Sequence, residues 1–125
     1  MRPLDDASLV KGGLPGDRHF SKQSQRQLLL IENETLARLG LTPGQVKENL
    51  TMQGIDLGGF LAGSRLRVGD AEIEITRVGE PCSRMEEIRP GLQRELIGRR
   101  GLYAVVVLPG RVWRGAQIDE IQPNR

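Results

Sequence analysis

The single cysteine of the chain, Cys82, is the residue best suited to nucleophilic or metal chemistry. It follows Gly79-Glu80-Pro81 after a predicted strand and precedes a predicted helix, so its sulfur is expected at a strand-to-helix turn. A helix N-terminus and a nearby Arg84 both favour the thiolate form of a cysteine. Such a thiolate is a soft metal ligand or a nucleophile. The alternative is that Cys82 is a small buried hydrophobe, and its position alone does not decide between the two.

The single histidine, His19, lies beside Asp17 and Arg18 in a glycine-rich segment with few apolar residues. His19 could serve as a base for Cys82 in a thiol hydrolase, but no local sequence signature supports that pairing. A structural zinc site is excluded, because it needs about four Cys or His ligands. The glycines of residues 12–16 are similar to an anion-binding loop, yet they do not follow a strand, and a plain turn is the alternative.

A third polar group lies within residues 45–52, a segment with the composition of a strand. In a strand, Lys47, Asn49 and Thr51 share one face because side chains alternate. A cation, an amide and a hydroxyl on one face would suit a polar anionic ligand. A solvated face without a ligand is the alternative.

Composition narrows the possible classes of protein. With 125 residues the chain fits one domain, 1–125, with one core. It has 18 basic side chains, mostly Arg, which indicates either an anionic ligand or a codon bias. The aromatic residues are too few, and the Arg residues too mixed with acids, for a nucleic-acid surface. No apolar run is long enough to cross a membrane and no secretory signal is present, so we expect a cytoplasmic protein without disulfides.

The positions of the turns predict a mostly β fold. Residues 26–31 form an apolar run typical of a strand buried on both faces, and Asn33 is the expected N-cap of a short helix ending at Gly40. Residues 65–68 and 71–76 alternate around Gly69-Asp70, which predicts a hairpin with one wet face. The first 24 residues are expected to be mainly loop.

The second half continues this pattern. Two short helices are predicted over residues 81–88 and 90–97, with Pro90 at the first helical position of the latter. Residues 102–108 are the most β-prone stretch, a turn follows at Pro109-Gly110, and residues 112–121 predict a pair of strands joined at Gly115. Short strands separated by glycine turns favour a small β-barrel with short helices.

Taken in order, these motifs resemble the MOSC domain, which forms the C-terminal end of molybdenum cofactor sulfurases. The resemblance extends over residues 10–121. It rests on GLPGDRH at 13–19, RQLLLI at 26–31, KENLT at 47–51, GIDL at 54–57, RVGDA at 67–71, EPC at 80–82, GRRGLYAVV at 98–106 and RGAQI at 114–118.

The resemblance implies a MOSC-type β-barrel and a molybdenum-pterin cofactor. Cys82 matches the family cysteine, which is a molybdenum ligand in the amidoxime-reducing members and has a sulfur-handling role in the sulfurase. Asn49 matches the asparagine of an Arg-Pro-Asn segment that contacts the pterin, and Lys47 matches its arginine by charge only. We expect Thr51, Asp17, Arg18, His19, Arg99 and Arg100 to complete the site around the anion.

Two departures qualify this expectation. The larger reductases have an additional N-terminal region that encloses the cofactor, so a homo-oligomer would be one way to complete the site here. The sequence also lacks ligands for iron-sulfur or haem groups, so electrons must come from a separate redox protein. The alternatives are a persulfide carrier that receives sulfur on Cys82 from a cysteine desulfurase, and a non-catalytic interaction module with Cys82 buried.

Overall fold

The computed structural model describes residues 6–13, 15, 21, 23–24, 26–43, 48–79, 84–96 and 101–121. These residues form a mostly β structure, as expected, with three short α-helices. The elements in chain order are β1 (Asp6–Leu9), β2 (Leu28–Glu32), α1 (Asn33–Arg38), β3 (Leu50–Met52), the 3-10 helix η1 (Leu57–Gly59), β4 (Arg65–Val68), β5 (Ala71–Val78), α2 (Met85–Ile88), α3 (Leu92–Glu95), β6 (Leu102–Leu108), β7 (Gly110–Trp113) and β8 (Ile118–Ile121).

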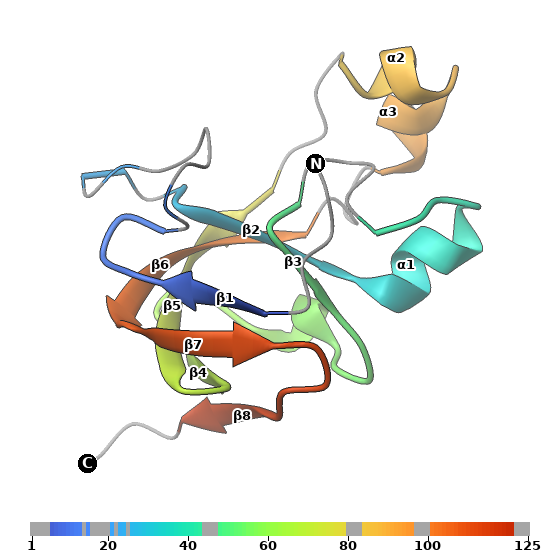
Figure 1. Cartoon of the computed structure of the whole chain (residues 1–125). Coiled ribbons are helices and arrows are strands. Elements are labelled where there is room, and N and C mark those ends of the chain that lie inside the picture. Colours follow the sequence, from blue (N-terminus) through green and yellow to red (C-terminus); the bar gives the residue numbers. More distant parts are fainter. Residues whose placement is uncertain are drawn as a thin grey trace.

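Six strands form one sheet in the order β3-β2-β6-β5-β4-β8, and β1 pairs with β7 in a second, two-stranded sheet. Within the larger sheet only the pair β2 and β3 is parallel. Figure 1 shows this sheet curling into a half-barrel, with the helices gathered at one end. The predicted MOSC-type fold, with its curled sheet and brief helices, is confirmed.

The hairpin of β4 and β5 has one wet face, as its sequence alternation predicted. Leu66, Ile73 and Ile75 are fully buried and belong to the main apolar cluster inside the curled sheet. On the outer face, Arg65 Nε lies 3.1 Å from Glu74 Oε1, and Arg67 Nη2 lies 3.7 Å from Glu72 Oε1. Exposed ion pairs of this kind add little stability, so the buried face holds the hairpin in register.

Strand β2 is buried on both faces, which confirms the interpretation of its apolar run. Leu28 and Leu30 pack in the main cluster, whereas Ile31 packs with residues of α1, α2 and α3. The strand begins at Leu28. At the preceding residue, Gln27, the buried side-chain Oε1 accepts a hydrogen bond of 3.0 Å from Val106 N of β6. The side chain of Gln27 thus extends the contact between β2 and β6 beyond the strand pairing.

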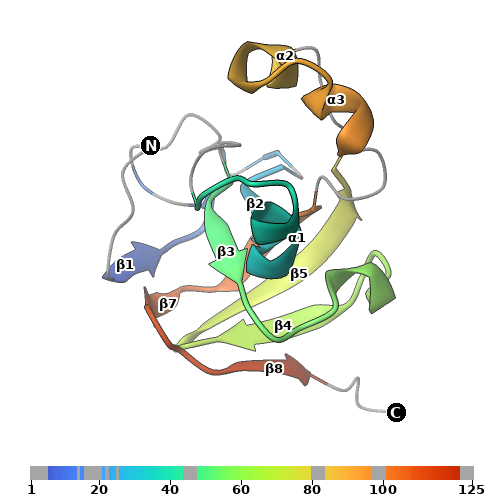
Figure 2. The same cartoon turned by 90° about the vertical axis from the view of Figure 1, so that its right-hand side faces the viewer.

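The helices form a second apolar cluster, which explains their place at one end of the sheet. Its buried members are Ile31, Leu36, Leu41, Met85, Leu92 and Leu96. Figure 2 shows α2 and α3 next to each other above α1. None of the helices in the described part of the chain is long and apolar enough to span a membrane.

The carboxylate of Glu86 stabilises the turn between α2 and α3, so the stability of this turn is expected to depend on pH. Glu86 Oε1 and Oε2 accept hydrogen bonds from Gly91 N (3.0 Å) and Gln93 N (2.9 Å). These bonds, that of Gly91 first, lower the pKa of Glu86 below its ordinary 4.5. Because the pKa is lowered in the folded chain, the stabilisation is present above pH 4.5 and is lost as the pH falls through the folded pKa.

We therefore expect the amide resonances of Gly91 and Gln93 to titrate together in acid, as followed by NMR. In the variant Glu86→Gln, which has no carboxyl to protonate, both resonances should stay flat over the same range. A titration that persists in Glu86→Gln would contradict this role of Glu86.

Three local predictions were wrong. Residues 6–9 form strand β1 and not a loop, because pairing with β7 stabilises them. Asn33 is the first residue of α1, whose N-cap is Glu32, and the Asn33 amide instead donates to Gln53 Oε1 over 3.4 Å. Helix α3 begins at Leu92, since Gly91 is its N-cap and has a left-handed φ of 86°. The two strands predicted on either side of Gly115 are present as β7 and β8, which pair with β1 and β4.

Candidate functional site

Two of the predicted site residues lie within the described structure, Asn49 and Thr51. Asp17, Arg18, His19, Lys47, Cys82, Arg99 and Arg100 lie outside the described residues, and their roles stay predictions. Strand β3 begins at Leu50, so residues 48 and 49 are not in the strand that the sequence pattern predicted. Asn49 and Thr51 are therefore placed by different local structures.

Asn49 is fixed by two hydrogen bonds to one residue of β2. Its backbone N donates to Leu29 O over 2.9 Å, and its side-chain Oδ1 accepts from Leu29 N over 2.7 Å. The side-chain carbonyl thus takes the place that a backbone carbonyl would have in the parallel pairing. The amide Nδ2 is buried and has no hydrogen-bond partner within the described part of the chain. Because Oδ1 is used by the fold, Nδ2 is the group that Asn49 can offer to a ligand.

Thr51 is joined to a buried carboxylate. Its Oγ1 donates a hydrogen bond of 2.6 Å to Glu48 Oε2, and Glu48 is 1% exposed. A hydroxyl has one proton to donate, so Thr51 in this state offers acceptor lone pairs only. A ligand contacting Thr51 here would meet it as an acceptor, which suits an N–H or O–H group better than an anion.

The strand register places Asn49 at one end of a line of residues across the sheet, which we call the cross-sheet row: Asn49, Leu29, Tyr103 and Arg77. Asn49 is bonded to Leu29, Leu29 pairs with Tyr103, and Tyr103 pairs with Arg77 on β5. Directly paired residues share one face of a sheet. The pairing of Arg77 follows an irregularity in β5 between Ile75 and Arg77, where Thr76 is the additional residue.

A further guanidinium lies over the row. The Cζ of Arg26 is 5.4 Å from the centre of the Tyr103 ring, within the range of a cation–π contact. Sequence reasoning missed Arg26, Tyr103 and Arg77, because only strand pairing between distant segments brings them together. One signal for such a site was present in the sequence, namely a tyrosine within the apolar residues 102–108. It was interpreted only as a sign of β propensity.

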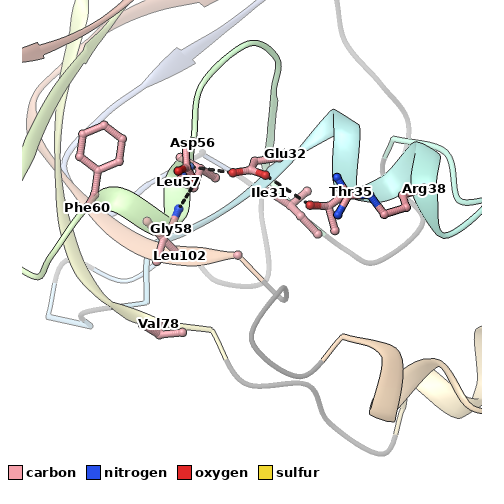
Figure 3. A pocket seen from close by; sticks show the side chains of 11 residues that line it. Ile31, Glu32, Thr35, Arg38, Asp56, Leu57, Gly58, Phe60, Val78 and Leu102 are labelled. Atoms are coloured by element: carbon pink, nitrogen blue, oxygen red, sulfur yellow. Dashed lines mark hydrogen bonds between the residues drawn. The ribbon is translucent and has the colours of Figure 1, made fainter.

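A pocket of about 310 Å³ lies at the end of the sheet, and no residue of the cross-sheet row lines it. Its walls come from the ends of β2 and β5, the start of β6, α1 and η1, and are formed by Ile31, Glu32, Thr35, Arg38, Asp56, Leu57, Gly58, Phe60, Val78, Gly101 and Leu102. Figure 3 shows Glu32 between Thr35 and Leu57, with Phe60 and Arg38 on opposite sides of the view.

The carboxylates of this pocket are used by the fold. Glu32 Oε2 accepts from Leu57 N over 2.7 Å, and its Oε1 accepts from Thr35 Oγ1 over 3.3 Å. Asp56 Oδ1 accepts from Gly58 N over 3.0 Å and caps η1. These bonds hold the loop around η1 against α1. Within the described ranges no three His, Cys, Asp or Glu side chains gather as a metal site.

Comparison with known families agrees with this geometry. The MOSC domain family matches residues 15–119 of the chain. The chain belongs to the MOSC domain family. The resemblance that the sequence motifs indicated is therefore confirmed, and the match includes every residue of the cross-sheet row.

Solved structures of related fold are similar to this MOSC domain over most of its length. The YuaD protein from Bacillus subtilis has a TM-score of 0.81 at 24% identity, with 92% of this chain and 84% of that chain covered. YiiM from Escherichia coli has a TM-score of 0.76 at 22% identity, covering 95% and 63%. YiiM from Geobacillus stearothermophilus has a TM-score of 0.75 at 21% identity, covering 94% and 60%. Comparison with curated proteins yields no match.

These likenesses establish the fold. This MOSC domain spans less than two thirds of either YiiM chain. What the whole proteins do is therefore a separate question from the architecture that they share with it.

Proposed function

We propose that this MOSC domain binds a molybdenum-pterin cofactor or a related anion beside Asn49, with Cys82 as its metal or sulfur ligand. The observation that carries the proposal is the buried Nδ2 of Asn49, which has no partner within the described residues. Leaving a buried donor unpaired costs about 1–3 kcal/mol. A ligand with a hydrogen-bond acceptor, such as a pterin ring or an oxyanion, would remove that cost.

The topology supports a role for the segments next to the row. Gly79 N donates to Gly101 O over 2.8 Å, so the chain leaves β5 and enters β6 at neighbouring points. In the sequence, Cys82 follows shortly after Gly79, and Arg99 and Arg100 directly precede Gly101. We propose that Cys82 binds the metal and that Lys47, Arg18 and Arg99 or Arg100 neutralise the anion, with Asp17 and His19 shaping the site. Bound molybdenum would supply the redox chemistry, with electrons from a separate redox protein.

The proposal is tested by the metal and pterin content of protein produced in a host that synthesises the cofactor. We expect both in the wild type, and a molybdenum content at least about tenfold lower in Cys82→Ala, because loss of a ligand weakens metal binding. Arg94→Gln, an exposed change on α3, is the control and should retain full metal.

Two outcomes would contradict this. Absence of both molybdenum and pterin from the wild type would remove the cofactor claim, and full metal in Cys82→Ala would remove the assigned ligand. Cyanide-releasable sulfur on the wild type but not on Cys82→Ser, without metal, would assign the persulfide-carrier function instead.

A further inference from the structure

The pocket at the end of the sheet, here called the α1 pocket, has the size and composition of a small-molecule site. Its volume of about 310 Å³ is at the lower end of the range for ligand pockets. One side of it is apolar, with the half-buried ring of Phe60 and the side chain of Val78. Val78 is 59% exposed, so an apolar ligand in the pocket would remove its side chain from water.

The α1 side of the pocket carries a guanidinium. Arg38 follows Thr35 by three residues on α1, so the two side chains share one face of the helix. Figure 3 shows the Arg38 side chain directed back towards Thr35, and both residues line the pocket. Glu34 is one turn before Arg38, but its Oε2 accepts a hydrogen bond of 2.8 Å from Gly54 N. Among the residues whose positions the structure gives, no carboxylate pairs with Arg38, so its N–H groups can donate to an anion.

Two carboxylates, Glu32 and Asp56, line the pocket on the other side of Thr35. Each accepts a backbone hydrogen bond from the loop around η1 through one of its oxygens. These bonds leave the negative charges in place, and Asp56 Oδ2 has no donor in the part of the chain that the structure describes. Thr35 Oγ1 lies 3.3 Å from Glu32 Oε1, so charges of opposite sign flank this one side chain.

These three features together specify a ligand with two charges and an apolar body. Glu32 and Asp56 would repel a simple anion, and Arg38 would repel a simple cation. We propose that the α1 pocket binds a zwitterionic amino acid with an apolar side chain. Its carboxylate binds Arg38, its ammonium group binds the two carboxylates, and its side chain packs against Phe60 and Val78. The site is separate from the proposed function, because neither of the described residues assigned to the cofactor lines this pocket.

The test is an NMR titration of the full chain with L-leucine and with two analogues that each lack one charge, isoamylamine and isocaproate. The amide resonances of Gly58 and Gly101, which both line the pocket, report its occupancy. We expect L-leucine to bind about tenfold more tightly than either analogue, because each analogue loses one charge-assisted contact. L-serine should bind about tenfold more weakly than L-leucine, because it has little apolar surface to bury.

Variants assign the two charges of the ligand to residues. Arg38→Gln should weaken binding of L-leucine about tenfold and should not weaken binding of isoamylamine, which has no group for Arg38. Asp56→Asn keeps the Oδ1 acceptor for Gly58 N, so it should weaken L-leucine and isoamylamine alike but not isocaproate. Arg94→Gln, an exposed charge change on α3, is the control and should alter none of these affinities.

Several outcomes would overturn the site. If L-leucine leaves both amide resonances unchanged, the pocket does not bind it. Equal affinity for L-leucine and isoamylamine would show a site for amines alone, and equal affinity for L-leucine and L-serine would remove the role of the apolar wall. Unchanged L-leucine binding in Arg38→Gln would remove the assigned carboxylate contact. None of these outcomes touches the metal and pterin content that tests the proposed function.

Discussion

Replacing Gly101 with alanine is expected to lower the free energy of unfolding by about 4 kcal/mol, among the largest effects of a single substitution. Gly101 has a φ of 105°, a region that L side chains rarely adopt. A Cβ at this position would also collide with the backbone carbonyl oxygen of Leu30. That atom belongs to a strand buried on both faces, so it cannot move aside without disturbing β2 and β6 together.

Gly115→Ala is the matched control for this prediction. Gly115 has a comparable φ of 84°, but an added Cβ would have no atom within 4 Å. Backbone strain alone should cost about 1–2 kcal/mol there. Urea unfolding of both variants measures the difference, which isolates the collision with Leu30. Equal losses of stability in the two variants would show that Leu30 does not determine the need for glycine at position 101.

Changing Asn49 to aspartate is expected to weaken binding of a pterin by about 100-fold. The new carboxylate keeps an acceptor for Leu29 N, which now bonds to Asn49 Oδ1. It replaces the Nδ2 donor with an oxygen, so the ligand's acceptor would meet another acceptor, and the hydrogen bond is lost and replaced by repulsion. Calorimetry on the folded variant measures the effect.

Asn49→Leu separates the structural role of this residue from its binding role. It removes the acceptor of Leu29 N as well as the donor, so stability should fall by about 1–3 kcal/mol as the backbone donor is left unpaired. Denaturant unfolding of Asn49→Asp and Asn49→Leu should therefore differ. Normal pterin affinity in Asn49→Asp would show that Nδ2 does not face the ligand, whatever the stability of the variant.

The parts of the fold that could be predicted from sequence depend on local pattern. The hairpin of β4 and β5 follows from strict alternation around Gly69-Asp70, and the double burial of β2 follows from its unbroken apolar run. Strand β1 could not be predicted, because its residues Asp6–Leu9 have weak β propensity and gain their structure from pairing with β7 at the far end of the chain.

In the candidate site, too, some residues could be predicted from local pattern and others depend on pairing between distant segments. Asn49 was predicted from the alternation of residues 45–52 and from a family motif, but its two bonds to Leu29 depend on the parallel pairing of β2 and β3. The contact between Arg26 and Tyr103 has no signal in the sequence. Arg26 shortly precedes β2 and Tyr103 lies in β6, so the two residues are far apart along the chain. Spacing along the sequence identifies the types of side chain, whereas the register of the sheet decides which of them meet.

The additional residue at Thr76 links the charge of this surface to the geometry of the sheet. A regular ladder after Ile75 would set Thr76 opposite Tyr103 and Arg77 opposite Leu102, the position that Val78 now holds. The irregularity therefore presents a cation opposite Tyr103, where a straight strand would present a hydroxyl.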